Sequence, residues 1–177
     1  MRLLKTDHEV LEAMLRDLIV QLEKANFTWA YDAFDLFWGS LTVHLNAEHN
    51  HLFPALLNSD QQRLGRDDLP THAELEDTIE QLRADHATFM DQLEELMREL
   101  RALVNSGPLN WDNRQSVEKI KKSLVSFSTW FQLHNETEEQ KIHTLPAQIL
   151  PAGDLVRLEM AIRIEIQNLP ARFAWAS

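Results

Sequence analysis

The chain has no cysteine among its 177 residues. This absence excludes disulfides, thiolate catalysis and iron–sulfur clusters held by cysteine, and it suits a reducing cytoplasm. Only four glycines are present, whereas the helix formers Leu, Glu and Ala are plentiful. No segment alternates apolar and polar residues with a period of two, so we predict helices and no strands.

Long apolar runs and an excess of positive charge are also missing. No run approaches the roughly 20 apolar residues of a membrane span, and the first residues lack the apolar stretch of a signal peptide. The formal net charge is −11 at pH 7, which argues against nucleic acid and anionic membranes as partners. We therefore expect a cytoplasmic protein that binds neither.

Apolar residues with a helical period predict one all-α domain over residues 1–177. Long helices are expected over about 6–24, 28–58, 71–106 and 112–150, with capping boxes at Thr6/Glu9 and Thr71/Glu74. Gly107-Pro108 should end the third helix and Asp112 should cap the fourth. Short connections between long helices predict an up-down-up-down four-helix bundle over about 6–150.

An additional apolar helix is expected over about 154–168, after the break at Pro151–Asp154. This helix, with Phe173 and Trp175 in the tail, would either cap the bundle or form a dimer, and we favour the cap. The sequence leaves the choice between monomer and homodimer open.

Histidine and glutamate recur in a duplicated pattern, which is the most informative feature of the chain. Each copy has an Asp-His pair on one helix, then His-x-x-x-Glu on the next, then a Leu-containing segment that ends in Pro. The two copies are Asp7-His8, His44-x-x-x-Glu48 and Leu52-Phe53-Pro54, and Asp85-His86, His134-x-x-x-Glu138 and Leu145-Pro146. This pattern indicates an internal repeat of a helix pair.

The predicted turns place the four histidines of the repeat at one level of the bundle. His8 and His44 are equally far from the first turn, His86 and His134 are almost equally far from the third, and every helix rises about 1.5 Å per residue. Each glutamate follows its histidine by four residues and therefore lies on the same helix face, one turn on. Buried, unpaired carboxylates are costly, and imidazole with carboxylate suits transition metals. We predict a metal site formed by His8, His44, Glu48, His86, His134 and Glu138.

Other polar residues near this pattern have simpler interpretations. The His-x-x-x-Glu spacing is weak by itself, because His8/Glu12 and His72/Glu76 share it. Asp7 and Asp85 either support the ligands from behind or lie exposed on the wrong face. Glu12 lies one turn after His8 and could add a ligand, but we expect it to be exposed. His72 should lie far from the site. His51 should lie too far along its helix to share an ion, and His49 and His143 should point away from the ligand faces.

At these motifs the chain resembles the hemerythrin family, specifically the HHE cation-binding domains, over about residues 6–150. The resemblance implies a non-haem di-iron centre in which Glu48 and Glu138 bridge the two irons and the four histidines are terminal ligands. An oxo or hydroxo group would complete the bridge. The ligand types alone do not separate iron from manganese, and we rank manganese and zinc below iron. Ferritin-like bundles use Glu-x-x-His instead.

The chain departs from oxygen-carrying hemerythrins at two points. These carriers place a further histidine one turn after the third-helix ligand, where this chain has Met90. Their fourth-helix carboxylate is usually an Asp five residues after the histidine, whereas Glu138 follows His134 by four. The resemblance thus implies a more symmetric centre with four histidines, similar to the branch linked to nitric-oxide and peroxide responses, iron-centre repair and sensing.

The expected function is to bind or react with oxygen, nitric oxide or peroxide at this centre. The alternatives are an iron donor or store, an iron-centre repair protein, and a sensor that acts through a partner. A zinc-loaded or metal-free bundle that acts only through its surface is a further alternative. Whether the protein is an enzyme stays open.

Overall fold

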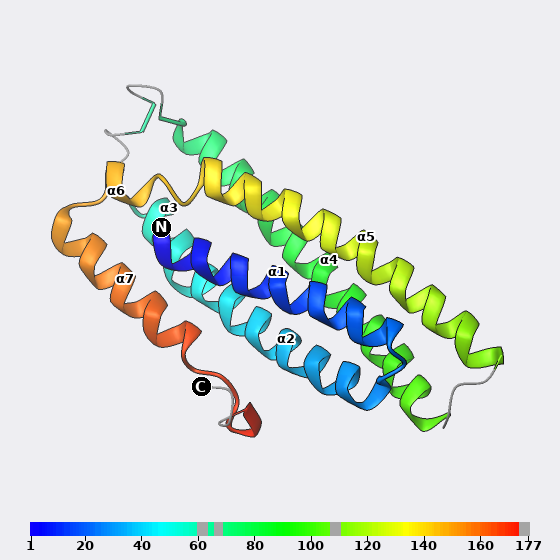
Figure 1. The fold of residues 1–177 in the computed structure, drawn as a ribbon. Coiled ribbons are helices and arrows are strands. Elements are labelled where there is room, and N and C mark those ends of the chain that lie inside the picture. Colours follow the sequence, from blue (N-terminus) through cyan, green and yellow to red (C-terminus); the bar gives the residue numbers. More distant parts are fainter. Residues whose placement is uncertain (60–63, 66–68, 107–110, 174–177) are drawn as a thin grey trace.

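A computed structural model describes residues 1–59, 64–65, 69–106 and 111–173. Its long helices are α1 (Arg2–Glu23), α2 (Phe27–Ala47), α4 (His72–Asn105) and α5 (Trp111–Lys141). They lie side by side (Figure 1), and α1 contacts α2, α2 contacts α4, α4 contacts α5 and α5 contacts α1. The described residues contain no strand, so the predicted all-α bundle is confirmed.

The start of α1 differs from the prediction, whereas the start of α4 agrees with it. The first helix begins at Arg2 without a side-chain cap, so the predicted cap at Thr6 was wrong. The reason is that Leu4 is fully buried and extends the apolar face by one turn. At α4, the backbone N–H groups of Thr71 and Glu74 each donate to the other's side chain, which confirms that capping box. The predicted features at Gly107-Pro108 and Asp112 lie outside the described residues and side chains.

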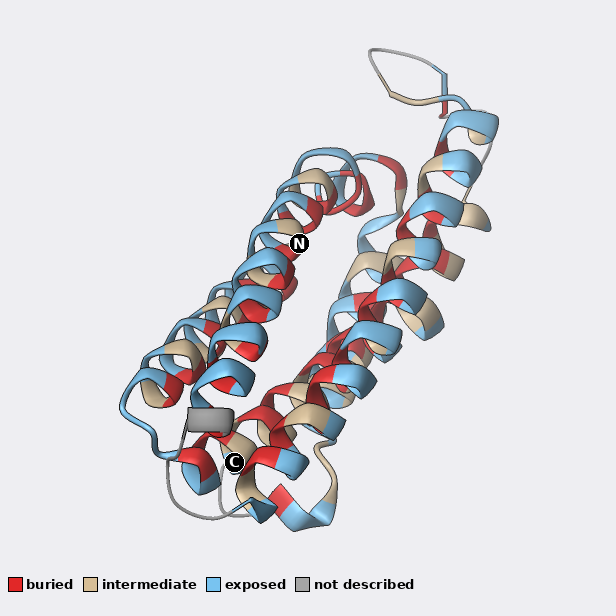
Figure 2. Ribbon diagram, turned by 90° about the vertical axis from the view of Figure 1, so that its right-hand side faces the viewer, coloured by how far each residue is buried: buried red, intermediate tan, exposed pale blue. Residues whose placement is uncertain are grey.

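Buried residues lie along the sides of the long helices that face one another (Figure 2). They form two apolar clusters. One is rich in phenylalanine, and the other lies towards the shorter helices α3 (Phe53–Leu57), α6 (Pro146–Ile149) and α7 (Ala152–Ile166). Along α1, Leu11 belongs to the first cluster and Leu4 to the second, and His8 lies between them. Along α4, Phe89 and Leu82 flank His86 in the same way. A polar layer therefore separates the two clusters.

The predicted second and fourth helices are interrupted next to this layer. The segment 28–58 consists of α2, a π-helix over Glu48–Leu52 and α3 over Phe53–Leu57. The segment 112–150 contains α5 only to Lys141, then a turn and the short α6 over Pro146–Ile149. Both uniform helices were wrong because Pro54 and Pro146 lack the N–H that would continue an α-helical ladder.

Beyond the bundle, α7 (Ala152–Ile166) packs against α2 and the π-helix, where Figure 1 shows it running beside α2. A 3₁₀ turn over Ala171–Phe173 follows. The side chain of Phe173 is buried, and the Arg172 guanidinium donates to both carboxylate oxygens of Asp35, at 3.0 and 3.1 Å. Helix α7 and this turn thus cover one side of the bundle, as predicted for a cap. The other aromatic residue of the predicted tail, Trp175, lies outside the described residues. Within those residues, no helix is long and apolar enough to cross a membrane.

The cap depends on a glycine. A Cβ atom added to Gly39 would lie 2.5 Å from Cε2 of the Phe173 ring, closer than two carbon atoms can approach. We expect Gly39→Ala to displace Phe173 and to speed tryptic cleavage after Arg172 severalfold, as measured by mass spectrometry of timed digests. The free energy of unfolding of the bundle should change little, because alanine favours a helix over glycine by about 1 kcal/mol and offsets the lost contact with Phe173. The matched control is Gly153→Ala, whose nearest neighbour is 3.6 Å away. Equal cleavage in both variants would contradict the close contact.

Candidate metal centre

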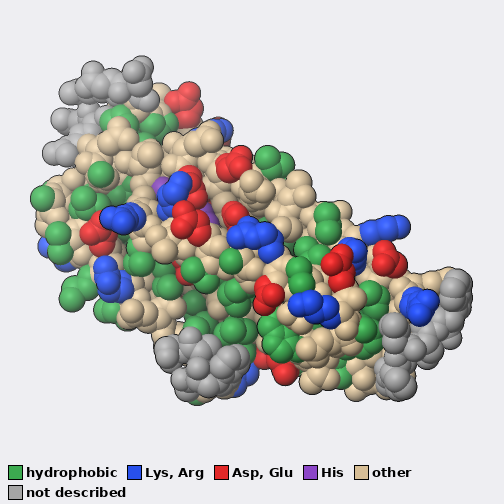
Figure 3. Space-filling view, in the orientation of Figure 1, with side chains coloured by type: hydrophobic (Ala, Val, Ile, Leu, Met, Phe, Trp, Pro, Cys, Tyr) green, Lys and Arg blue, Asp and Glu red, His purple; other side chains and the backbone are tan. Residues whose placement is uncertain are grey.

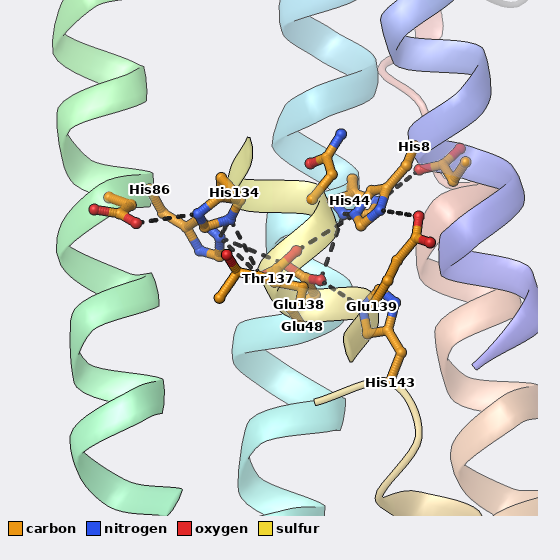
Figure 4. Close-up of polar contacts among 12 residues, drawn as sticks. His8, His44, Glu48, His86, His134, Thr137, Glu138, Glu139 and His143 are labelled. Atoms are coloured by element: carbon orange, nitrogen blue, oxygen red, sulfur yellow. Dashed lines mark hydrogen bonds and ion pairs between the residues drawn. The ribbon is translucent and has the colours of Figure 1, made fainter. Parts of the chain in front are cut away.

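All six predicted ligands meet in the polar layer. His8 comes from α1, His44 from α2, Glu48 from the start of the π-helix, His86 from α4, and His134 and Glu138 from α5. Each is at most 4% exposed. Figure 4 shows Glu48 and Glu138 between the His8 and His44 side chains on one side and the His86 and His134 side chains on the other. The predicted common level of the four histidines is therefore confirmed.

The histidines form two pairs whose Nε2 atoms face each other. The Nε2 atoms of His8 and His44 are 3.0 Å apart, and those of His86 and His134 are 2.9 Å apart. Donor atoms that are about 2.1 Å from one ion and at right angles to each other lie about 3.0 Å apart. Each pair thus has the spacing of two ligands of one metal ion.

Each glutamate directs one oxygen to each histidine pair. Glu138 Oε2 is 3.4 Å from His8 Nε2, and its Oε1 is 3.3 Å from His86 Nε2. Glu48 Oε1 is 3.5 Å from His44 Nε2, and its Oε2 is 3.6 Å from His86 Nε2. Carboxylates in this orientation can bridge two cations, one beside each histidine pair.

The aspartates of the repeat support histidines on neighbouring helices. The Nδ1 atom of His44 is 2.7 Å from Asp7 Oδ2, and that of His134 is 3.2 Å from Asp85 Oδ2. A carboxylate that accepts from Nδ1–H keeps the proton on that nitrogen, so Nε2 is the atom that can bind a metal once the imidazole is neutral. Of the two alternatives for these aspartates, the structure supports the position behind the ligands.

The residues that follow the two glutamates act in the same way on the other two histidines. Glu139 Oε1 is 3.4 Å from His8 Nδ1, and His49 Nε2 is 2.8 Å from His86 Nδ1. The expectation that His49 points away was therefore wrong. The π-helix rotates His49 towards α4, because its wider turn changes the angle between successive side chains.

The expectation for His143 was also wrong. This histidine is 4% exposed, and its Nε2 atom lies 3.4 Å from Glu48 Oε1. Together with His8, Glu48 and Glu138 it forms a group whose potential ligand atoms all lie within 4.8 Å of one another. The cause is the end of α5, where the N–H of His143 donates to the carbonyl of Glu138, five residues back, at 2.8 Å. Pro146 is the sequence signal for this break.

The remaining candidates lie outside the cluster, as expected for His51 and His72. His51 is 3.6 Å from Glu165 of α7, and His72 is 3.3 Å from Glu76 at the start of α4. Glu12 is half-buried and accepts a hydrogen bond from the amide of Asn135 at 3.0 Å, so it is neither a ligand nor fully exposed.

The histidines and carboxylates of the cluster stabilise one another's charged forms. Burial disfavours the charged form of His44, but the carboxylates of Glu48 and Asp7 outweigh burial and raise the pKa of His44 to about 10. Burial and Glu138 disfavour the charged form of Glu48, but the neighbouring histidines outweigh them and lower its pKa to about 2. A cation that replaces the protons of the histidines would satisfy the same carboxylates.

The carboxylate oxygens themselves indicate that a cation fits. Among the described residues, Glu48 Oε2 and both side-chain oxygens of Glu138 are buried without a hydrogen-bond partner. Buried carboxylate oxygens are nearly always compensated, and their neighbours here are imidazole nitrogens at ligand spacing. The donor set of imidazole and carboxylate suits transition metals. The cluster can therefore hold metal ions.

Comparison with known families agrees with this geometry. Residues 1–145 match the hemerythrin HHE cation-binding domain. The chain belongs to this family. No curated protein and no solved structure matches the chain. The hemerythrin-like match includes all six predicted ligands and His143, and it ends before α7.

In the view of Figure 3 only small areas of histidine are visible, between acidic and basic side chains, so the centre is covered on that face.

The raised pKa of His44 predicts that metal binding releases protons. At pH 7 this imidazole is protonated in the metal-free protein, whereas a ligand must be neutral. We expect at least one proton to leave per chain at pH 7, and the apparent affinity for metal to fall about tenfold per pH unit on acidification. Calorimetry in buffers of different ionisation enthalpy measures the release. Metal binding at pH 7 without proton release would contradict the charged state of His44.

The same shifts give the pH range over which the cluster stabilises the metal-free fold. The raised pKa of His44 adds stability that is complete below its ordinary value of 6.5 and is lost as pH rises towards 10. The lowered pKa of Glu48 adds stability that is complete above 4.5 and is lost as pH falls towards 2. Both contributions are therefore complete only between about 4.5 and 6.5.

Proposed function

We propose that this hemerythrin-like domain holds a non-haem di-iron centre that binds or reacts with a small oxidant, namely oxygen, nitric oxide or peroxide. In this proposal Glu48 and Glu138 bridge the two irons, and His8, His44, His86 and His134 are terminal ligands. The observation that carries the proposal is that each buried carboxylate directs one oxygen to each histidine pair. Two such bridges define two metal positions rather than one.

The assignment of iron rests on family membership together with the ligand set. Two neighbouring irons bridged by carboxylates supply a redox-active pair that can bind diatomic ligands and peroxide. Zinc has no redox chemistry, so a zinc-loaded centre would support only a structural role.

The protein's own residues would orient the ligands and exclude water. Asp7 and Asp85 accept hydrogen bonds from the outer nitrogens of His44 and His134, which fixes the orientation of both rings. The phenylalanine-rich cluster lies against the centre, where Phe89 contacts His134 edge to face with ring centroids 4.9 Å apart. This apolar wall keeps water away from a bound oxidant and strengthens the interactions of charge inside the centre.

Met90 argues against reversible oxygen carriage as the main role. Oxygen carriers have a histidine at this position, whereas the thioether of Met90 is a weak ligand and packs, partly buried, against the phenylalanine-rich cluster. The metal beside His86 and His134 then keeps fewer protein ligands. Fewer protein ligands leave more positions that can exchange, which favours reaction over carriage.

The test is anaerobic spectroscopy of the iron-loaded protein with oxygen, nitric oxide and peroxide added in turn. We expect about two irons per chain, near-ultraviolet absorption of bridged iron(III) after oxidation, and a spectral change with at least one of the three oxidants. The matched control is His134→Ala, which should lose both the iron and the spectral change.

Other outcomes separate the alternatives. Rapid disproportionation of peroxide would make the protein an enzyme, and a stable, reversible oxygen adduct would contradict the role given to Met90. Loss of iron to a chelator within minutes would favour an iron donor. A colourless preparation that binds zinc but not iron would refute the proposed function.

A further inference from the structure

The two halves of the centre are related residue by residue. His8 corresponds to His86, and His44 corresponds to His134. Each first-helix histidine also contacts a residue that follows the glutamate of one repeat. His8 contacts Glu139 and His86 contacts His49, so the residue after each glutamate has the same structural role in both halves.

The correspondence extends to a widened helical turn at each glutamate. The N–H of Phe53 donates to the carbonyl of Glu48, and the N–H of His143 donates to the carbonyl of Glu138. Both bonds span five residues, so the side chain at the fifth position lies on the same face as the glutamate. Phe53 and His143 are therefore counterparts, and each follows the glutamate of its His-x-x-x-Glu motif by five residues.

These counterparts stack on corresponding histidines. The ring of Phe53 stacks on His86 with centroids 6.1 Å apart, and the ring of His143 stacks on His8 with centroids 5.2 Å apart. Both side chains are buried. At this position one half presents a phenyl ring where the other presents an imidazole.

His143 has the contacts of a ligand. Its Nε2 atom is 3.4 Å from Glu48 Oε1, the oxygen that also faces His44 Nε2 at 3.5 Å. Its other ring nitrogen, Nδ1, is buried and has no hydrogen-bond partner among the described residues. A buried imidazole with no better hydrogen-bonding partner than a carboxylate oxygen of the centre is suited to bind a cation there. Figure 4 shows His143 on the same side of the glutamates as His8.

We propose that His143 is a fifth histidine ligand, bound to the metal position of His8 and His44, and that external ligands attach at the other position. This proposal rests on the proposed function, because it assigns unequal roles to the same two metal ions. The first position would have three imidazoles and two bridging carboxylates. The second would have two imidazoles, the same carboxylates and the inert ring of Phe53, so it has more coordination sites for exchangeable ligands.

The contacts of the Nδ1 atoms of the four histidines make the two metal positions more unequal. The first pair of histidines is supported by two carboxylates, Asp7 and Glu139. The second pair is supported by the carboxylate of Asp85 and by the imidazole of His49. Since a carboxylate behind an imidazole increases its basicity, the first ion should be held more tightly.

The test uses Co²⁺, whose unpaired electrons shift the ring N–H proton signals of each coordinating histidine in the NMR spectrum. The wild-type protein with two Co²⁺ ions should show five shifted, exchangeable N–H signals, and His143→Phe should show four. Phenylalanine is the residue that the chain itself places at the corresponding position, so the fold should tolerate it. The matched control is His51→Phe, which should keep five signals.

Retention of the ions gives a second measurement. With excess chelator, the wild-type protein should lose its two Co²⁺ ions at rates that differ at least tenfold, and in His143→Phe this ratio should shrink severalfold to the part that the contacts behind the histidines contribute. Azide, used as the external ligand, should shift the signals that disappear in His86→Ala and leave the signal of His143 in place.

The failures of the two proposals are distinguishable. A wild-type protein that binds fewer than two transition-metal ions would overturn the proposed function. A protein that binds two Co²⁺ ions but shows four shifted signals, or whose release rates are unchanged in His143→Phe, would overturn only the role of His143. An azide effect confined to the position of His8 and His44 would overturn the assignment of the external ligand.

Discussion

Replacing Glu138 by glutamine is expected to remove most of the metal from the protein. Glu138 is the carboxylate that belongs to both groups of potential ligands, one with His8, Glu48 and His143 and one with His86 and His134. Glutamine keeps the size of the side chain but loses the negative charge, so one substitution weakens both metal positions. Changes to residues behind metal ligands typically reduce affinity about 10- to 100-fold, and loss of a shared ligand should cost at least about 100-fold.

The measurement is metal content per chain after gel filtration, together with affinity from competition with a chelator. The matched control is Glu95→Gln on α4, which is exposed and forms a surface ion pair with Arg98 at 2.9 Å. This control should keep the wild-type metal content, because exposed pairs of this kind contribute little. Equal metal content in both glutamine variants would contradict the ligand assignment.

The Glu138→Gln protein should remain folded. In the metal-free state this substitution removes a charge that pairs with His8, His86 and His134 at 3.3–3.4 Å, so it lowers the stability of the fold. The two apolar clusters of the bundle are unchanged and keep the helices together. Far-ultraviolet circular dichroism should therefore show the wild-type helix content, which separates loss of metal from loss of structure.

Removal of the metal should produce the largest change in thermal stability. An ion at 100 times its dissociation constant stabilises the folded state by about 2.7 kcal/mol, so two ions contribute about 5 kcal/mol. For a domain of this size, 1 kcal/mol corresponds to about 2–4 °C in Tm. We therefore expect chelation to lower Tm by about 10–20 °C, as measured by circular dichroism at a fixed concentration of free metal.

Two comparisons make this prediction specific to the centre. Glu138→Gln should show a Tm that is nearly independent of added metal, whereas Glu95→Gln should respond as the wild-type protein does. A wild-type Tm that does not change on chelation would mean that the described cluster is stable without an ion, and the prediction would be wrong.

The meeting of the six candidate ligands could be predicted from the sequence because helical geometry is local and regular. The spacing from His44 to Glu48 and from His134 to Glu138 places each pair on one helix face. The distances of His8 and His86 from the predicted turns then bring both to the same level. The duplication made the pattern specific, and the capping box at Thr71 was predictable because it involves only four consecutive residues.

The wrong expectations for His49 and His143 have a common physical cause, which is departure from α-helical geometry next to the site. A uniform α-helix would rotate His49 and His143 away from the ligand faces. The wider turns at Glu48 and Glu138 rotate them inward. Pro54 and Pro146 show that the helical ladder is interrupted, but they do not show which way the following side chains turn.

The sequence by itself determined the all-helical fold and six of the residues that meet in the polar layer, because both depend on periodicity along single helices. The tertiary structure decided which partner each histidine has. Asp7 supports His44 on the next helix rather than its neighbour His8, because adjacent residues on a helix point in different directions. It also decided the difference between the halves. Phe53 and His143 each follow their glutamate by five residues, but only the wider turns at Glu48 and Glu138 bring both side chains against the histidines.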